Sequence, residues 1–287
     1  MDNRIVNPVT ADWLAERLGL SVQGDGATVA NQVLPVSEIA AGALCFSKTS
    51  IEISVNAVVI APPDCDAVVG AVILSDNPRL DFCRALIVLE SDPGFQRSTA
   101  EPDIHPSARI GRFADIGKGV TIGPRTEIAS FCYIGDNVTI GAECKIRTGA
   151  IIGEEGYGFE RDESGMPIRM PHLGSVKIGD RVLVGAATTV CRGTLSDTIV
   201  EDDVKIDDHV HIAHNCLLKR GAMVVACAEV SGGVTLGERS WVGPNAAVIQ
   251  QLDIGDDALI GLGTVVIRSV DDGDVVVGNP AKSIRKT

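Results

Sequence analysis

Residues 104–152 read IHPSARIGRFADIGKGVTIGPRTEIASFCYIGDNVTIGAECKIRTGAII, and an isoleucine occupies every sixth position of this stretch. The aliphatic series resumes at Ile178 and continues through Val184 and Val190. It then starts again, four residues out of phase, and runs from Val200 to Val266. A period of six fits neither an α-helix nor the simple alternation of a β-strand. It is typical of a parallel β-helix, in which each short strand forms one side of a coil.

Two further positions repeat with the aliphatic one. Four residues after it lies a small or medium side chain, which predicts a second inward position at Ala108, Ala114, Val120, Thr126, Cys132, Val138, Cys144, Ala150, Cys216, Ala228, Ala246, Ala258 and Thr264. The residue directly after it is often glycine, which we interpret as a corner with unusual dihedral angles. Three sides of six residues make a coil, so the repeat predicts a prism of about eight coils, roughly 40 Å long.

The composition narrows the class of protein. Among 287 residues, 45% are hydrophobic but only 3% are aromatic, which suits thin repetitive coils packed with aliphatic side chains. A net charge of −13 without a basic patch disfavours nucleic-acid binding. No apolar run is long enough to span a bilayer, and MDNRIVNPVT does not resemble a signal peptide. Eight cysteines without a C-x-x-C pair predict buried, reduced thiols in a cytoplasmic protein, with neither disulfides nor zinc.

Residues 1–100 do not follow the six-residue period, so we predict a separate small α/β domain there and a β-helix domain over residues 101–287. Thr10 can cap a helix that buries Trp13, Leu14 and Leu18. Residues 56–60 and 71–74 are typical of buried strands. Asn77 followed by Pro78 predicts the start of a second helix, with a buried face of Phe82, Leu86 and Leu89. Residues 91–103 are the expected linker.

Two segments interrupt the repeat. The first, residues 154–176, contains Tyr157, Phe159 and His172, and we predict that it forms a wall of the active site, because long loops leaving a regular solenoid are often functional. The second, residues 192–199, shifts the phase by four. The chain ends in a short basic tail, Lys282, Arg285 and Lys286, which suits an acidic partner, a ligand that carries phosphate, or simple solvation.

Three of the five histidines are close together in DDHVHIAHN, as His209, His211 and His214. Because Ile212 takes the inward position, His211 and His214 should point outward. For His209 and His211 we favour a role as polar surface residues. The context of His214 is more informative.

Several motifs surround His214: G-Y-G-F at 156–159, P-x-L-G-x-V-x-I-G-D at 171–180, T-x-x-R-G-x-L-x-D-T-I at 189–199 and I-A-H-N at 212–215. With VQGDGATVANQVLPVSEIAAGALCF and VILSDNPRLDFCRAL in the first domain, they make nearly the whole chain resemble the UDP-3-O-acylglucosamine N-acyltransferases of lipid A biosynthesis. The resemblance implies a left-handed parallel β-helix, a nucleotide-binding first domain, a homotrimer and an acyl donor linked to acyl carrier protein or coenzyme A. It implies no tightly bound cofactor.

The same resemblance suggests roles for individual residues. His214 matches the general base and Gly232 the oxyanion donor. Histidine titrates near neutrality and can take the proton of an attacking amine, and a glycine N–H is accessible to an oxyanion. The eighteen residues between the two are one full coil, which independently predicts that they stack. Asn215 and Asp208 are weaker candidates for orienting His214 or the amine.

Three features depart from the family pattern. Phe46 matches the aromatic residue of its uracil pocket, but residues 47–52 read SKTSIE, with Thr49 and Glu52 in place of the expected asparagine and tyrosine. Gln251 replaces a further histidine. The ending GNPAKSIRKT resembles that of acetyl-CoA-dependent sugar acetyltransferases, so an acetyl-CoA-dependent nucleotide-sugar N-acetyltransferase is the alternative.

Two other classes remain open. A metal enzyme of the γ-carbonic anhydrase type would use His209 and His214 with a third histidine, from His211, His172 or His105, on a neighbouring subunit. A scaffold without catalytic activity is the other. We predict no metal and favour the acyltransferase.

Overall fold

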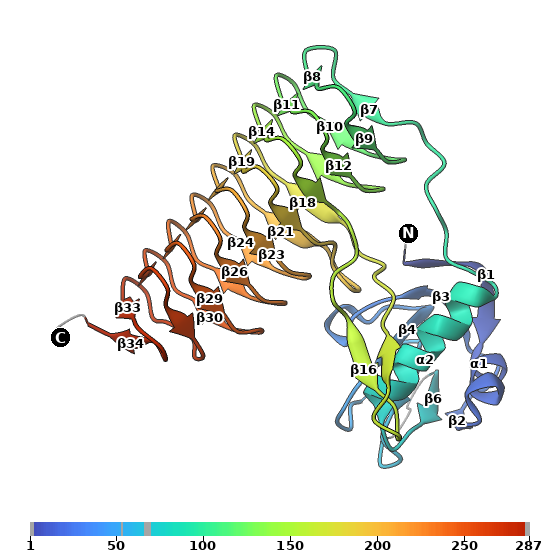
Figure 1. The fold of residues 1–287 in the computed structure, drawn as a ribbon. Helices are drawn as coiled ribbons and strands as arrows, with labels where there is room; N and C mark the ends of the chain where they lie inside the picture. Colours follow the sequence, from blue (N-terminus) through green and yellow to red (C-terminus); the bar gives the residue numbers. More distant parts are fainter. Residues whose placement is uncertain (1–2, 53, 66–69, 285–287) are drawn as a thin grey trace. The chain divides into compact units, whose positions relative to one another are not determined.

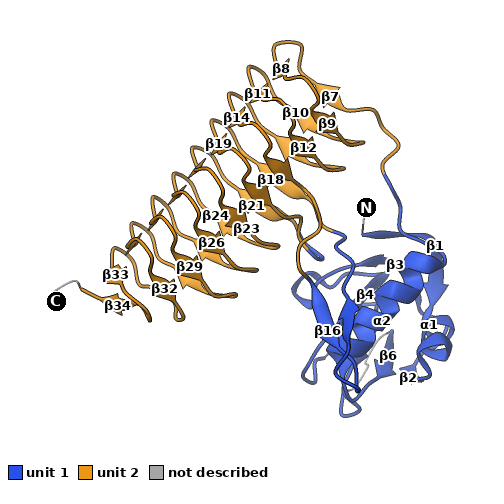
Figure 2. Ribbon diagram, viewed as in Figure 1, with its two compact units in different colours: residues 1–97, 158–173, 194–196 blue, residues 98–157, 174–193, 197–287 orange. Residues whose placement is uncertain are grey.

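The computed structural model describes residues 3–52, 54–65 and 70–284 (Figure 1). The chain forms two compact units (Figure 2). Unit 1 comprises residues 1–97, 158–173 and 194–196, and unit 2 comprises residues 98–157, 174–193 and 197–287. The break at residue 97 lies close to the expected boundary at 100. Residues 158–173 and 194–196, which we expected within the β-helix domain, group instead with the N-terminal residues.

Unit 1 contains a six-stranded mixed sheet in the order β1-β3-β4-β5-β6-β2. Its four inner strands are parallel and its two edge strands antiparallel. The strands are β1 (Arg4–Thr10), β2 (Ser21–Gly24), β3 (Val29–Val33), β4 (Ala43–Phe46), β5 (Val58–Ala61) and β6 (Ala71–Leu74). A short 3₁₀ helix, η1 (Val36–Glu38), precedes β4. The two strands predicted from sequence correspond to β5 and β6.

The two α-helices of unit 1 begin at the predicted caps. The Thr10 side chain accepts a hydrogen bond from Trp13 N at the start of α1 (Ala11–Leu18). Asn77 accepts one from Leu80 N at the start of α2 (Pro78–Ser91). The predicted buried face of α2 is confirmed, since Phe82, Leu86 and Leu89 are fully buried.

A hairpin from the first interruption belongs to unit 1 because it packs on α2. Its antiparallel strands are β16 (Phe159–Arg161) and β17 (Pro167–Arg169). Arg84 on α2 pairs with Glu163 at 2.6 Å, and the Cys83 thiol donates to Arg169 O at 3.3 Å. Leu173 is buried in the core of the unit. These contacts explain why most of the interruption groups with the N-terminal residues.

Unit 2 is a three-sided parallel β-helix, and the stacked coils are evident in Figure 1. Side 1 has eight strands: β7 (Asp103–Ile104), β10 (Thr121–Ile122), β13 (Thr139–Ile140), β18 (Val176–Ile178), β21 (Thr198–Val200), β24 (Leu217–Leu218), β27 (Thr235–Leu236) and β30 (Asp253–Ile254).

Side 2 has ten strands, the last one antiparallel: β8 (Arg109–Ile110), β11 (Glu127–Ile128), β14 (Lys145–Ile146), β19 (Leu183–Val184), β22 (Lys205–Ile206), β25 (Met223–Val224), β28 (Trp241–Val242), β31 (Leu259–Ile260), β33 (Val275–Val277) and β34 (Lys282–Ser283). Side 3 has eight: β9 (Asp115–Ile116), β12 (Tyr133–Ile134), β15 (Ile151–Ile152), β20 (Thr189–Val190), β23 (His211–Ile212), β26 (Glu229–Val230), β29 (Ala247–Val248) and β32 (Val265–Val266). The prediction of about eight coils is confirmed.

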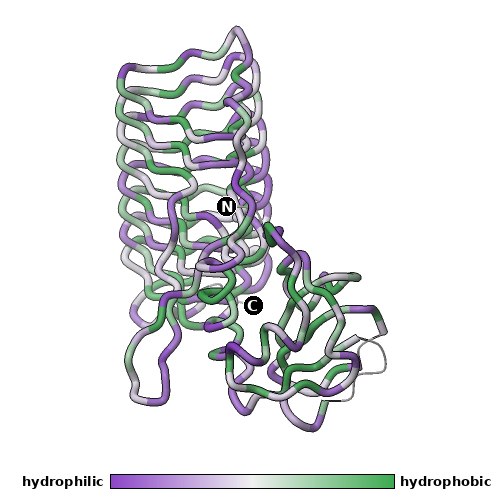
Figure 3. Tube along the Cα trace, turned by 90° about the vertical axis from the view of Figure 1, so that its right-hand side faces the viewer, coloured by the Kyte–Doolittle hydropathy of each residue, from purple (hydrophilic) through white to green (hydrophobic). Residues whose placement is uncertain are grey.

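The core of the β-helix consists of the two inward rows predicted from sequence. The aliphatic row is buried from Ile122 onward, and so is the small row, which includes Cys132, Cys144 and Cys216. In Figure 3 apolar segments recur at the same place in successive coils. Each coil therefore buries little by itself and is stabilised by stacking on its neighbours.

The glycines after the aliphatic residues have a different role from the one we predicted. All but Gly153 have ordinary dihedral angles, whereas the left-handed residue of each corner lies two positions later and is usually not glycine. A Cβ atom at Gly111 would lie 2.5 Å from Ser130 N, in the next coil. These glycines therefore serve the close approach of stacked backbones, and the corners rely on left-handed residues such as Asn137, Asn215 and Gln251.

Both interruptions leave the β-helix at the same corner. The first follows β15 and the second follows β20, and both strands belong to side 3. We call the turn that follows each strand of side 3, before the chain enters side 1, corner 3–1. The two interruptions therefore emerge on neighbouring coils of one corner.

Candidate functional site

Corner 3–1 also holds the residues singled out by sequence. His214 follows β23, Gly232 follows β26 and Gln251 follows β29. These three strands are neighbours in register, with His211 opposite Glu229 and Glu229 opposite Ala247. The predicted stacking of His214 and Gly232 is thus present, and it occurs directly beyond the two interruptions.

The imidazole of His214 lies against Gly232. A Cβ atom at Gly232 would lie 2.6 Å from Cε1 and 2.8 Å from Nε2 of the ring, so no larger residue fits there unless the ring moves. Nδ1 lies 3.0 Å from Oδ1 of Asn215. An amide oxygen only accepts hydrogen bonds, so this contact places the proton on Nδ1 and leaves Nε2 with a lone pair. A half-buried histidine held in that tautomer is suited to act as a base.

The N–H group of Gly232 is a hydrogen-bond donor without an acceptor among the described residues of the next coil. In some coils the N–H two residues after the aliphatic one donates to an aspartate of the next coil, as Lys118 does at corner 3–1, to Asp136 at 2.9 Å. The residue one coil beyond Gly232 is Gln250. Among the described residues, the Gly232 N–H donates to no acceptor. The site thus contains a backbone donor beside the imidazole.

Asn215 and Gln251 are both left-handed corner residues, each with φ of 60°. The backbone N–H of Gln251 donates to Gly232 O at 3.0 Å, and a Cβ atom at Gly233 would lie 3.4 Å from its side chain. The N–H of Asn215 donates to the Thr198 hydroxyl at 2.9 Å. The structure therefore brings Asn215 and Gln251 together with His214 and Gly232.

Asp208 is not brought to His214. It follows β22 on side 2, one corner earlier in the coil. Its carboxylate accepts hydrogen bonds from Ala186 N at 2.7 Å and from Arg147 at 2.8 Å. These contacts are structural, whereas the Asn215 side chain contacts the imidazole directly.

Of the three aromatic candidates, Phe46 and Phe159 belong to unit 1 and Tyr157 belongs to unit 2. Phe46, at the end of β4, packs on Phe82 of α2 with ring centroids 4.8 Å apart. Tyr157 is 88% exposed and is the last residue of unit 2 before the hairpin. Phe159 belongs to β16 in unit 1. A role for these residues in binding remains a prediction.

The remaining histidines have separate surroundings. His172 is buried in unit 1, with Nδ1 3.0 Å from Met170 O. His209 is a left-handed residue at the corner between sides 2 and 3, and His105 contacts the Ser107 hydroxyl. Within the described part of the chain, no group of three or more His, Cys, Asp or Glu side chains could hold a metal ion.

Two thiols lie near the site but are poor nucleophiles. Burial raises the pKa of the Cys216 thiol to about 12 and that of Cys191 to about 11. Both are therefore neutral near pH 7, and only a thiolate attacks acyl groups efficiently. All eight cysteines are free and seven are buried, as predicted, but Cys227, which we expected to be buried, is exposed.

Sequence reasoning missed Arg192 and Thr198 as contributors to the site, although both belong to the 189–199 motif. Arg192 is buried, and its guanidinium donates to Gly174 O at 2.9 Å and to Asp136 O at 3.1 Å. Asp197 accepts from Ser175 N at 2.7 Å and pairs with Lys177. Residues of the second interruption thus hold the end of the first, at 174–177, by hydrogen bonds and an ion pair.

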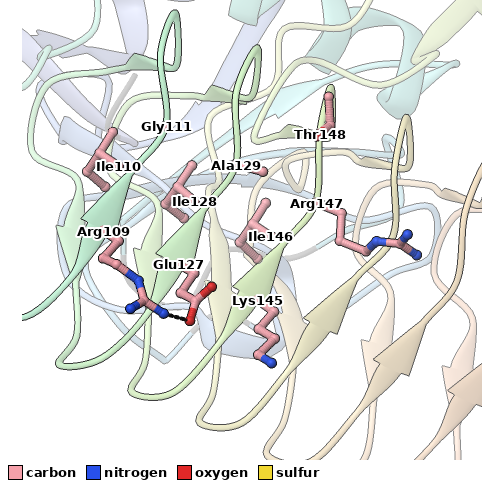
Figure 4. Close-up of a pocket in the computed structure, with 10 residues that line it drawn as sticks. All are labelled: Arg109, Ile110, Gly111, Glu127, Ile128, Ala129, Lys145, Ile146, Arg147 and Thr148. Carbon is pink, nitrogen blue, oxygen red and sulfur yellow. Dashed lines mark hydrogen bonds and ion pairs between the residues drawn. The ribbon is translucent and has the colours of Figure 1, made fainter.

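Two shallow cavities of about 390 Å³ lie elsewhere on the β-helix. One is on side 2 of the first coils, where Arg109 and Glu127 form an ion pair beside Lys145 (Figure 4). The other lies at the C-terminal coils and includes Arg268 and Lys282. Neither contains His214 or Gly232. Across residues 3–52, 54–65 and 70–284, no helix has the length and apolarity needed to cross a bilayer.

Several curated proteins similar to this chain carry the same name. A UDP-3-O-acylglucosamine N-acyltransferase of Delftia acidovorans is 36% identical, over 91% of this chain and 82% of its own length. The protein of the same name from Herminiimonas arsenicoxydans is 30% identical, over 90% of this chain and 84% of its own length. The one from Coxiella burnetii is 36% identical, over 76% of this chain and 73% of its own length. No protein-family model matches the chain.

Solved structures support the fold. A Francisella novicida UDP-N-acetylglucosamine acyltransferase matches 65% of this chain and 66% of its own, with a TM-score of 0.58 and 28% identity. A Moraxella catarrhalis UDP-N-acetylglucosamine O-acyltransferase matches 64% and 72%, with a TM-score of 0.54 and 26% identity. This likeness confirms the predicted left-handed parallel β-helix.

Proposed function

The chain belongs to the UDP-3-O-acylglucosamine N-acyltransferase family, and from that premise we propose that it transfers an acyl group from a thioester to the amine of a nucleotide-linked amino sugar. The observation that carries the proposal is the packing of the His214 imidazole on Gly232, with Asn215 fixing its tautomer. The relatives share one name, and those of Delftia acidovorans and Herminiimonas arsenicoxydans match 91% and 90% of this chain.

In the proposed mechanism His214 is the general base. Its Nε2 lone pair removes a proton from the sugar amine as the amine nitrogen attacks the thioester carbonyl carbon. The Nδ1–H group, held by Asn215 Oδ1, keeps the ring in the required tautomer and stabilises the imidazolium that forms. The side-chain amide of Asn215 carries no charge and therefore does not stabilise the imidazolium as strongly as a carboxylate would. The imidazolium can therefore release its proton again after the attack.

Gly232 is proposed to supply the oxyanion hydrogen bond. As the carbonyl becomes tetrahedral, its oxygen gains negative charge and accepts from the Gly232 N–H, which donates to no other described group. When the intermediate collapses, the carbon–sulfur bond breaks and the thiolate takes the proton from His214. The products are an amide and a free thiol, and the base is regenerated. Neutral Cys191 and Cys216 support direct transfer without an acyl-cysteine intermediate.

The acyl donor is a thioester, and its carrier is acyl carrier protein or coenzyme A. Corner 3–1 continues past Gly232 through Gln251 to Arg268, two coils further along, roughly 10 Å at the usual strand spacing. We propose that the carrier arm follows this corner and that Arg268 and Lys282 favour its phosphate. Arg285 and Lys286, the other basic residues predicted to contribute, lie outside the described residues.

For the acceptor, we propose that unit 1 binds the nucleotide, and that Phe46, Tyr157 and Phe159 contribute to binding. The length of the match to the relatives supports a use for both units. The loop at residues 47–52 differs from the expected pattern. Its Ser47 hydroxyl donates to Thr49 O at 2.7 Å, so the side chain that begins the loop is engaged locally.

We also propose a homotrimer, because a half-buried His214 on the outside of a prism needs a second wall to exclude water. Light scattering of the purified protein is expected to give three times the mass of the 30.0 kDa chain. A monomer at the concentrations used for the assay would contradict this part of the proposal.

An acyl-transfer assay tests the proposed function. We expect amide formation on UDP-3-O-acylglucosamine, measured by mass spectrometry, with acyl carrier protein thioesters and acetyl-CoA offered in parallel. Turnover with acetyl-CoA alone would indicate the nucleotide-sugar N-acetyltransferase instead. Absence of amide with every donor, over a panel of UDP- and other nucleotide-linked amino sugars, would leave a scaffold without catalytic activity.

A further inference from the structure

The second interruption has a consequence at the corner that holds His214. At corner 3–1 the left-handed residue of a coil normally donates its N–H to a carbonyl of the preceding coil. Asn137 donates to Lys118 O at 2.9 Å, Gly233 to His214 O at 2.9 Å, and Gln251 to Gly232 O at 3.0 Å. The regular acceptor for Asn215 would be the carbonyl of Arg192, where the chain leaves the coil.

The backbone N–H of Asn215 donates to a side-chain hydroxyl in place of that carbonyl. Its N–H donates to Oγ1 of Thr198 at 2.9 Å. Thr198 is fully buried at the start of β21, and its own N–H donates to Ser175 O at 3.0 Å, where the first interruption returns. The hydroxyl therefore replaces a missing backbone contact at one corner residue, the one whose side chain holds the catalytic base.

We propose that Thr198 is a positioning residue that holds Asn215 in its left-handed conformation, so that the Asn215 side chain keeps His214 in the tautomer with an unprotonated Nε2. This inference rests on the proposed function, because it assigns Thr198 to the orientation of the proposed base. The proposal also gives a role to the motif at 189–199. The four extra residues remove the regular backbone acceptor from the corner, and Thr198 supplies a hydroxyl acceptor in its place.

Thr198→Val tests the proposal, because valine has nearly the same shape but no hydroxyl. We expect kcat to fall by about 10- to 100-fold with KM changed by less than about 3-fold, since a small displacement of a base has effects of this size. Thr198→Ser should restore kcat to within about 3-fold of the wild type, because it restores the acceptor.

Thr188→Val is the matched control. Thr188 is also fully buried, and its hydroxyl joins neighbouring coils, donating to Asp207 O at 2.6 Å and accepting from Val210 N at 3.1 Å. It contacts neither Asn215 nor His214. We expect a similar loss of Tm in the two valine variants but loss of kcat only in Thr198→Val. Equal kcat in the two would overturn the proposal.

A second measurement does not depend on activity. The ¹⁵N chemical shifts of the His214 ring should report the Nδ1–H tautomer in the wild type, Thr198→Ser and Thr188→Val, and a mixture of tautomers in Thr198→Val. An unchanged tautomer in Thr198→Val would reject the role of Thr198 even if the protein proves to be a different acyltransferase. If His214→Ala leaves the rate intact, the proposed function fails, whatever the tautomer.

Discussion

His214→Ala is expected to lower kcat by roughly 10²–10⁴-fold, with a much smaller change in KM, because a positioned general base acts mainly on the chemical step. Truncation removes the Nε2 lone pair but leaves the Gly232 N–H and the binding surfaces in place. The measurement is steady-state acyl transfer at saturating donor and acceptor. The loss should shrink as pH rises, because a larger fraction of the amine is then already deprotonated.

His209→Asn is the control for this experiment. His209 is a left-handed residue at another corner of the same coil, and asparagine tolerates that conformation. Its kcat should stay within about 3-fold of the wild type if only the base matters. A rate for His214→Ala within tenfold of the wild type would rule out the mechanism.

Gly232→Ala is expected to have the next largest effect. Gly232 has an ordinary backbone conformation, so alanine causes no dihedral strain, but its methyl group would lie 2.6 Å from Cε1 and 2.8 Å from Nε2 of His214. The ring must move away from the oxyanion donor. We expect kcat to fall by roughly 10²–10³-fold, the size of effect seen when an oxyanion contact is lost.

The double variant His214→Ala/Gly232→Ala makes this prediction specific. Without the imidazole the methyl group has room, so the second substitution should add little to the loss already caused by the first, in kcat and in Tm. Fully additive losses would show that Gly232→Ala acts on something other than the ring. A Gly232→Ala enzyme with more than a third of the wild-type kcat would contradict the geometry.

Much of the fold could be predicted because the period is strict. In a coil with three equal sides, the position within the six-residue repeat determines whether a side chain points inward. The inward rows, including Cys132 and Cys216, were therefore predictable one residue at a time. The same rule explains why His214 and Gly232 stack: eighteen residues return the chain to the same corner.

The period also accounts for the candidate that the structure did not bring to the site. Asp208 lies six residues before His214, which is one side of the prism, and its carboxylate binds Ala186 and Arg147 at a different corner. Gly232, eighteen residues after His214, shares its corner. Proximity in sequence was thus a poorer guide than position in the repeat.

The sequence by itself determined the β-helix, the separate first domain and the stacking of His214 on Gly232, since each depends only on whether and where a residue falls in the six-residue repeat. Only the tertiary structure decided which contacts form where the six-residue repeat is interrupted. Residues 158–173 join unit 1 through contacts with α2, and Thr198 supplies the acceptor that the opened coil no longer offers to Asn215. The physical reason is that a repeat predicts the contacts between equivalent positions. An insertion has no equivalent in the next coil, so its contacts depend on where the chain actually folds.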